Sequence, residues 1–180
     1  MAIVSIEATA SGEDAVRALL LSRLGPAYRL ATCILRDDEA AEDAVQEAAL
    51  RAWAMRRGLR DPDRAEAWFA RIVVNTCRAE LARRTRRPMV GETELLGGAG
   101  AAVDADETSE LRDEVGRALA RLSPDEQIVV AMRYGRDMTV PQIAAQTGIR
   151  EGTVKSRLHN AHEHLRAAFQ AERRAEEAGR

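Results

Sequence analysis

The sequence predicts an all-α protein of two small helical domains joined by a flexible linker. Ala, Leu, Arg and Glu dominate its 180 residues, and all four favour helices over strands. Aromatic residues make up only 3% of the chain, whereas a β-sandwich needs many Val, Thr and Tyr residues. A glycine-rich, acidic stretch without helical spacing marks the linker. We therefore expect domains at residues 1–87 and 109–180, with the linker at residues 88–108.

The first two helices of the first domain can be placed from their end signals. The first is expected at residues 13–36, where Gly25 followed by Pro26 predicts a kink or a break. The second begins after Asp37 or Asp38, because either carboxylate can cap it and first-turn acids suit the positive end of the helix dipole. Spacing of three and four residues predicts its core face, formed by Ala41, Ala44, Val45, Ala48 and Ala52.

A third helix is expected after the segment GLRDPDR, at residues 58–64. Its Asp-Pro pair and second Asp are helix start signals. The apolar side of this helix is formed by Trp68, Phe69, Ile72, Val73 and Cys77. It ends in the strongly basic run RAELARRTRR, so one end of the first domain is positively charged.

Four shorter helices are expected in the second domain. The first is marked by Leu111, Val115, Ala118, Leu119 and Leu122. The sequence SPDE at residues 123–126 is a capping box with proline in the first turn, and TVPQ at residues 139–142 opens the third helix in the same way. Gly148 then permits a left-handed turn, and the fourth helix covers residues 150–169.

The last two of these helices have the pattern of a helix-turn-helix. Their small core is predicted at Ile143, Ala144, Ile149, Val154, Leu158, Ala161 and Leu165. This leaves a polar and basic face for solvent or a DNA groove. Short polar and basic side chains in the first turns of a helix suit contacts with phosphates and base edges, so the pattern predicts DNA binding. A helical hairpin with a solvated face is the alternative.

The net charge of −2 hides an uneven distribution. Residues 1–50 hold four arginines against nine acids, a net charge of −5. Residues 51–87 hold eleven arginines against four acids, a net charge of +7. Residues 88–110 hold six acids and no base. The chain thus combines an acidic face, a basic segment and an acidic connector.

The cellular compartment of the protein can be inferred from the cysteines and from the absence of targeting signals. Cys33 and Cys77 have no CxxC spacing, which indicates reduced, buried thiols rather than redox sensors. The N-terminus lacks the basic-then-apolar order of a signal peptide, and no apolar run approaches the ~18 residues of a membrane span. We expect a soluble, cytoplasmic protein without membrane insertion.

Three motifs together make the sequence resemble a bacterial extracytoplasmic-function (ECF) sigma factor of the sigma-70 family. They are AEDAVQEAALRAW, AWFARIVVNTCRAELARR and GTVKSRLHNA, at residues 41–53, 67–84 and 152–161. The resemblance covers residues 13–88 and 109–169. It implies a region 2 domain of three to four helices and a helix-turn-helix region 4 domain, which together direct core RNA polymerase to promoters.

The resemblance implies two contacts with polymerase. Region 2 docks on the clamp helices of the β′ subunit, and region 4 docks on the β flap. The residues that match the clamp-binding segment are Glu42, Asp43, Gln46 and Glu47. Judged from this stretch alone, a solvated acidic face is the alternative.

The loop after Trp53 and the third helix are implied to recognise and melt the promoter's minus-ten element by capturing an unstacked base. The charge of +7 supplies the attraction that binding a DNA strand needs. The minus-ten candidates are Arg56, Arg57 and Arg60 in the loop, and Asn75, Arg78, Arg83 and Arg84 on the third helix. Trp68 and Phe69 favour a core position over base stacking.

The fourth helix of the second domain is implied to bind the minus-thirty-five element. Its candidates are Arg150, Thr153, Lys155, Ser156, Arg157, His159 and Asn160, among which Lys155 and Arg157 are expected to contact phosphates. The family usually continues this helix with arginines, where this chain has HNAHEHL. Fewer phosphate contacts predict weaker binding of the upstream element, which tethering to polymerase compensates.

The histidines and the remaining sequence indicate neither a metal nor a catalytic site. His159 and His162 share one side of a helix, but His164 points elsewhere, so coordination of a metal by all three is poor. The chain has no glycine-rich phosphate loop and no nucleophile elbow. We therefore expect a protein that is not an enzyme and has no cofactor.

The resemblance implies a protein that is monomeric when free and is held inactive by an anti-sigma factor. Two other functions are alternatives. A sigma-like mimic would sequester an anti-sigma factor without binding promoters, and the HNAHEHL segment favours it. A stand-alone helix-turn-helix regulator would leave the first domain unexplained.

Overall fold

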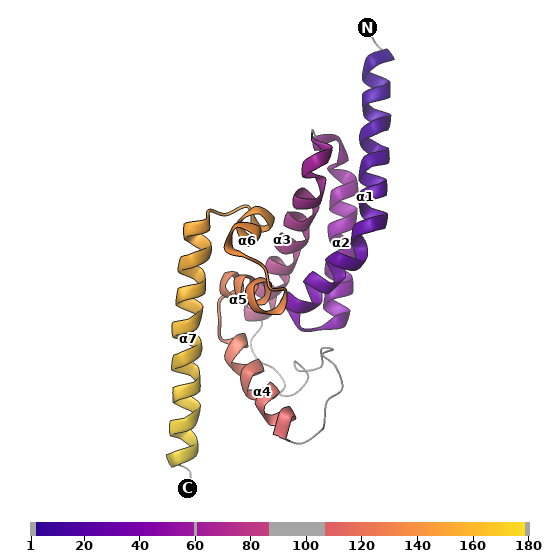
Figure 1. Cartoon of the computed structure of the whole chain (residues 1–180). Coiled ribbons are helices and arrows are strands. Elements are labelled where there is room, and N and C mark those ends of the chain that lie inside the picture. Colours follow the sequence, from indigo (N-terminus) through magenta and orange to yellow (C-terminus); the bar gives the residue numbers. More distant parts are fainter. Residues whose placement is uncertain (1–2, 60, 87–106, 179–180) are drawn as a thin grey trace.

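The computed structural model describes residues 3–59, 61–86 and 107–178, and all regular elements in these ranges are helices (Figure 1). The prediction of an all-α fold is confirmed. Most of the expected linker, residues 88–106, lies outside the described residues. No helix of the described ranges is long and apolar enough to cross a membrane.

The first half of the fold is a three-helix unit with two short 3-10 turns. Its elements are α1 (Ile3–Leu35), α2 (Asp38–Ala54), η1 (Arg56–Gly58), η2 (Pro62–Arg64) and α3 (Ala65–Arg86). The Asp37 side chain caps α2 as predicted, since it accepts a hydrogen bond from the Ala40 amide at 2.9 Å. The buried face of α2 consists of the five residues predicted from their spacing.

Helix α1 differs from its prediction in where it begins and in its course at Pro26. It begins ten residues earlier than expected. Of the two alternatives predicted at Gly25 and Pro26, a break is excluded, because the helix continues through this proline. The residues that follow this proline, Ala27, Leu30 and Ala31, are buried in the core. Packing against α2 and α3 therefore offsets the backbone hydrogen bond that proline removes.

The second half contains α4 (Glu107–Ala120), α5 (Pro124–Val130), η3 (Ala131–Gly135), α6 (Val140–Thr147) and α7 (Glu151–Ala178). Both predicted capping boxes begin helices: Glu126 accepts from the Ser123 amide at 2.9 Å, and Gln142 accepts from the Thr139 amide at 2.8 Å. Gly148 has φ 75°, the left-handed turn expected of it. The π-helical turn η3 and the extension of α7 beyond residue 169 were not predicted.

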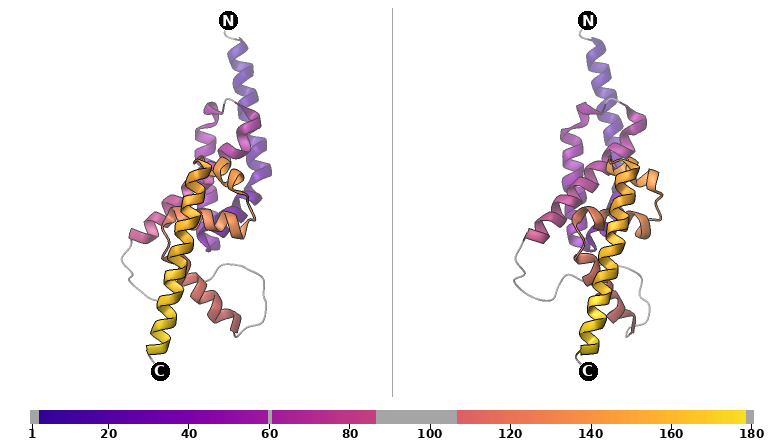
Figure 2. Two further views of the ribbon diagram at one scale, coloured as in Figure 1. Left: turned by 60° about the vertical axis from the view of Figure 1, so that its left-hand side comes forward. Right: turned by 90° about the vertical axis from the view of Figure 1, so that its left-hand side faces the viewer.

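The two halves pack on each other through one continuous hydrophobic core. Helix α3 lies against α5 and α6, and α1 contacts η3, as Figures 1 and 2 show. The core runs from Leu30, Phe69 and Val73 in the first half to Val129, Ile143 and Val154 in the second. In this structure the region 2-like and region 4-like units are closed against each other.

Cys33 lies at the contact between the two halves, and its thiol donates a hydrogen bond to the Ala131 carbonyl at 3.4 Å. Both cysteines are free thiols, and Cys77 is fully buried. Burial raises the pKa of both groups, that of Cys77 to about 12, so neither forms a reactive thiolate readily at neutral pH.

Gly135 fits against this thiol without room for a side chain. A Cβ at Gly135 would lie 2.2 Å from the Cys33 sulfur. Gly135→Ala is therefore expected to lower the free energy of unfolding by about 1–3 kcal/mol, measured by urea denaturation followed by circular dichroism. Adding Cys33→Ala should restore most of this loss, because it removes the clashing atom.

A matched control is available at Gly152, where a Cβ would meet nothing within 4 Å. Gly152→Ala is expected to be neutral or to stabilise the helix by up to about 1 kcal/mol. Equal stability of Gly135→Ala and Gly152→Ala would contradict the close contact with Cys33.

Candidate nucleic-acid and protein interfaces

The solvent side of α2 is an acidic face opposite its buried alanines. The four residues predicted to bind polymerase are all exposed on it: Glu42, Asp43, Gln46 and Glu47. Glu42 accepts from Gln46 at 3.2 Å, and Glu47 pairs with Arg51 at 2.6 Å. Within the described chain Asp43 has no hydrogen-bond or ion-pair partner of its own, so its carboxylate is free for a basic partner.

Trp53 and η1 form a second exposed surface at the end of α2. Trp53 is 41% exposed, and the Arg56 guanidinium lies 4.7 Å from its ring centroid. Arg56 also donates to the Trp53 carbonyl at 3.0 Å, and Arg57 is exposed beside it. Arg60 lies outside the described residues. An exposed indole with a cation on it is a surface on which an unpaired base can stack.

The minus-ten candidates on α3 have different surroundings. Arg83 and Arg84 both bind the Glu80 carboxylate, at 2.7 and 3.0 Å, and Arg84 also pairs with Asp37 at 2.9 Å. Burial alone would raise the pKa of Glu80, but the hydrogen bonds from Arg84 and Arg83 outweigh it and lower the pKa. Arg84 therefore ties α3 to the start of α2, besides its predicted role at DNA.

Asn75 and Arg78 lie one turn apart on α3, and the Arg78 guanidinium donates to the Asn75 side-chain oxygen. Asn75 is exposed. Arg78 is half-buried because it also forms an ion pair with Asp125 of α5, with Nε 2.7 Å from Oδ1. One minus-ten candidate is thus occupied by a carboxylate of the other half of the molecule.

The first turns of α7 present the upstream candidates as predicted from the helix-turn-helix pattern. Val154, Leu158 and Ala161 are buried. Exposed positions on the opposite side are Arg150, Lys155, Ser156, His159 and Asn160, while Thr153 and Arg157 are half-buried. Arg157 forms an ion pair with the second oxygen of Asp125 at 2.7 Å.

The histidines of α7 have separate environments. His159 is exposed, His162 Nε2 lies 2.7 Å from the Tyr134 hydroxyl, and His164 Nδ1 lies 3.1 Å from Glu126. No group of three His, Cys, Asp or Glu residues in the described ranges is arranged to hold a metal ion. Two of the three histidines instead fasten α7 to η3 and α5, which is a packing role for the segment that departs from the family pattern.

Glu126 is 6% exposed and is the anchor of this contact. Its carboxylate accepts from the Ser123 hydroxyl at 2.8 Å and from the Ser123 amide at 2.9 Å, and His164 approaches it as well. Burial would raise the pKa of Glu126, but these hydrogen bonds and the charge of His164 outweigh it and lower the pKa below the ordinary value of 4.5.

Glu126→Gln tests this anchor. A carboxyl group whose pKa is lowered by folding stabilises the protein above its unfolded pKa, and this contribution is lost as the pH falls through the folded pKa. The variant is expected to lose about 1–3 kcal/mol of stability at pH 7 and to show a flatter decline below about pH 4.5. Denaturant unfolding measured from pH 7 to pH 3 checks both. The control, Glu163→Gln, removes an exposed carboxylate of α7 and should leave the wild-type profile unchanged.

Asp125 was predicted only as part of a helix start signal. The structure gives it two long-range partners, one on α3 and one on α7. The sequence SPDE does not indicate such partners. An acid in the first turn of a helix is already explained by the positive end of the helix dipole.

Comparison with known families defines the class of the protein. A family model described as Sigma-70 region 2 matches residues 19–87, and one described as Sigma-70, region 4 matches residues 112–165. These ranges cover the unit with the acidic face and basic third helix, and the unit with the helix-turn-helix. The chain therefore has the two regions of a sigma-70-type sigma factor.

Similar proteins show to which subfamily of the sigma-70 family the chain belongs. The chain is 36% identical over 169 residues to the ECF RNA polymerase sigma factor SigL of Mycobacterium tuberculosis, covering 92% of this chain and 95% of SigL. It is 32% identical over 145 residues to the RNA polymerase sigma-E factor of Streptomyces avermitilis, covering 79% of this chain and 78% of that one. This chain belongs to the ECF RNA polymerase sigma factors.

Two solved structures share the fold. One contains the sigma factor RpoE with the anti-sigma factor NepR from Bartonella quintana, with a TM-score of 0.58, 22% identity, and coverage of 86% of this chain and 96% of that one. The other contains CnrH with the cytosolic domain of CnrY, with a TM-score of 0.59, 22% identity, and coverage of 94% and 96%. The helical fold is thus shared with the sigma factor RpoE and with CnrH.

Proposed function

We propose that this ECF sigma factor binds the clamp helices of core RNA polymerase through the acidic face of α2. Region 2, residues 1–87, recognises and melts the minus-ten element, and region 4, residues 109–180, binds the minus-thirty-five element and the β flap. The observation that carries the proposal is the exposed acidic face itself: Glu42, Asp43, Gln46 and Glu47 lie outside the core, and the Asp43 carboxylate has no partner in the described chain.

Single-strand capture is assigned to the surface around Trp53. An exposed indole, the cation on its face and the exposed Arg57 next to it combine stacking with phosphate attraction. Asn75 and Arg78 on α3 are assigned to the same minus-ten element. The first turns of α7 supply phosphate contacts through Lys155 and Arg157.

The factor acts without catalysing a reaction of its own, in the cytoplasm, as a monomer until it binds polymerase. Its regulator is an anti-sigma factor that covers one of the two surfaces. The support is the shared fold with RpoE and CnrH, whose structures contain NepR and the cytosolic domain of CnrY.

Run-off transcription with purified core polymerase on a promoter library tests the proposal. The expected result is transcription that depends on the factor and starts at a defined set of promoters. A protein that does not bind core polymerase, with no inhibitor present, would remove the proposed function. A protein that binds polymerase and opens no promoter would instead be a mimic that sequesters an anti-sigma factor.

A further inference from the structure

The carboxylate of Asp125 lies between two guanidinium groups that we assign to different promoter elements. Its Oδ1 is 2.7 Å from Arg78 Nε on α3, and its Oδ2 is 2.7 Å from an Arg157 terminal nitrogen on α7. The three side chains are 36%, 30% and 26% exposed, in the order Asp125, Arg78, Arg157. One acid thus holds both halves of the DNA-binding surface at once.

We propose that Asp125 is an internal competitor of promoter phosphates, which keeps the free factor closed and poorly able to bind DNA. The proposal rests on the function assigned above, since Arg78 and Arg157 matter only if they contact the promoter. A guanidinium binds a carboxylate and a phosphate with the same fork of donors, so it cannot serve both at the same time.

A second contact on the same side of α3 closes the helix-turn-helix against it. Arg71 lies two turns before Arg78, and it donates to the Ala145 carbonyl of α6 at 3.5 Å. Its guanidinium also lies under the turn, where a Cβ at Gly148 would be 2.6 Å from Arg71 Nε. In the closed protein two arginines of α3, Arg71 and Arg78, therefore contact region 4, although Arg71 remains exposed to solvent.

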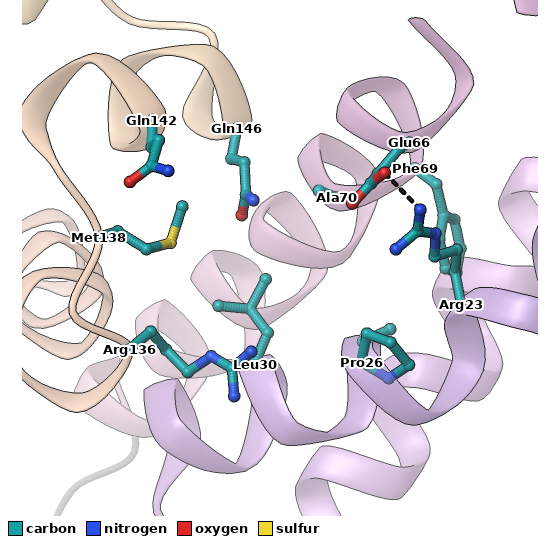
Figure 3. Close-up of a pocket in the computed structure, with 11 residues that line it drawn as sticks. Arg23, Pro26, Leu30, Glu66, Phe69, Ala70, Arg136, Met138, Gln142 and Gln146 are labelled. Atoms are coloured by element: carbon teal, nitrogen blue, oxygen red, sulfur yellow. Dashed lines mark ion pairs between the residues drawn. The ribbon is translucent and has the colours of Figure 1, made fainter. Parts of the chain in front are cut away.

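The contact between the two halves is not filled along its whole length. Beside the continuous core, the two halves leave a cavity of about 300 Å³ between α1 and α3 on one side and the segment around α6 on the other. Figure 3 shows Met138 and Gln146 across this cavity from Leu30 and Pro26. This cavity is half open to solvent, so the interface between the two halves is not filled along its whole length.

The ion pairs of Asp125 with Arg78 and Arg157 are also weak enough to be broken when the two halves separate. Ion pairs that are about a third exposed contribute little, since water and salt screen them. They add to the shared hydrophobic core in favouring the closed state of the free protein, but they do not resist polymerase, which holds the two regions apart at their separate docking sites. Once the regions are apart, both arginines are available to DNA phosphates.

The test uses the full-length free protein and a short fluorescent DNA duplex of arbitrary sequence, because phosphate contacts do not depend on sequence. Asp125→Asn is expected to bind this duplex about 3- to 10-fold more tightly than the wild type at equal salt. The dependence of the binding constant on salt should steepen by about one to two phosphate contacts. Small-angle X-ray scattering should show a larger radius of gyration.

Glu163→Gln is the matched control, because it removes the same charge from an exposed position of α7. It should bind the duplex within about twofold of the wild type. Equal affinities for Asp125→Asn and Glu163→Gln, or an unchanged radius for Asp125→Asn, would overturn the proposal. Circular dichroism of each variant establishes that it is folded.

Arg71→Ala provides an independent variant with the opposite change of charge. Losing a cation alone weakens DNA binding, whereas opening the closed state strengthens it. The proposal expects a larger radius of gyration with DNA affinity at or above the wild-type value. Weaker binding at an unchanged radius would contradict it.

Transcription with core polymerase separates this proposal from the function on which it rests. Asp125→Asn holoenzyme should initiate within about twofold of the wild type, because polymerase has already separated the regions. If the wild type initiates normally while Asp125→Asn fails to gain DNA affinity in the free state, only the competitor role is wrong. If the wild type neither binds polymerase nor initiates, the assigned function is wrong whatever Asp125 does.

Discussion

Asp43→Arg is expected to lower the affinity for core RNA polymerase by about 100-fold, equivalent to about 2.7 kcal/mol. Asp43 is exposed in the middle of the acidic face of α2 and has no partner in the described chain. Reversing its charge therefore costs the folded protein little. Against a basic partner the same change places two like charges together, which costs several kcal/mol. Binding of labelled factor to purified core polymerase measures the effect.

Asp14→Arg makes the same change of charge on an exposed part of α1 and serves as the control. It should bind polymerase within about twofold of the wild type, since surface charges away from an interface contribute weakly. Free Asp43→Arg should also keep its affinity for DNA. Polymerase binding by Asp43→Arg at the wild-type level would exclude this face of α2 as the docking surface.

Lys155→Ala is expected to weaken upstream promoter binding of the holoenzyme by about tenfold, with unchanged polymerase affinity. Lys155 is exposed in the second turn of α7. One lost phosphate contact should reduce the slope of the logarithm of the binding constant against the logarithm of salt by about 0.9. Titrating holoenzyme onto a promoter fragment at several salt concentrations measures both quantities.

Arg157→Ala should have a comparable effect in the holoenzyme and a smaller one in the free factor, where Asp125 already occupies Arg157. Gln170→Ala, more than three turns further along α7 and also exposed, is the control and should bind DNA as the wild type does. An Arg157→Ala holoenzyme with unchanged promoter affinity would remove this residue from the upstream site.

Helix starts and turns could be predicted because neighbouring residues determine them. The Asp37 cap, the capping boxes at Ser123 and Thr139, and the left-handed Gly148 each depend on atoms within a few positions along the chain. The apolar face of α2 could be predicted for the same reason, since helical periodicity alone places its alanines on one side.

Features that depend on distant contacts could not be predicted. Helix α1 passes through Pro26 because the residues after it pack on α2 and α3. The far end of α7 is held by Glu172, which approaches Arg117 and Arg121 of the α4 segment at 3.6 and 3.8 Å. Neither the π-helical turn η3 nor the fit of Gly135 against Cys33 has a local signal.

In the candidate site, too, features set by neighbouring residues could be predicted and features set by distant contacts could not. Exposure of the α2 acids and of most α7 candidates follows from the pattern of buried residues in each helix. The partners of Arg78, Arg84 and Arg157 do not, because they lie on other elements. Sequence spacing identifies which side of a helix is available, while only the folded chain shows which charges are already neutralised.

The core shared by the two halves has a thermodynamic consequence. Because Phe69 and Val73 belong to one cluster with Ile143 and Val154, melting either unit exposes apolar surface on the other. The free factor should therefore unfold in a single cooperative transition, although its sequence divides into two regions. Once the halves separate, each becomes a small domain that must remain folded on its own core or on the surface of its partner.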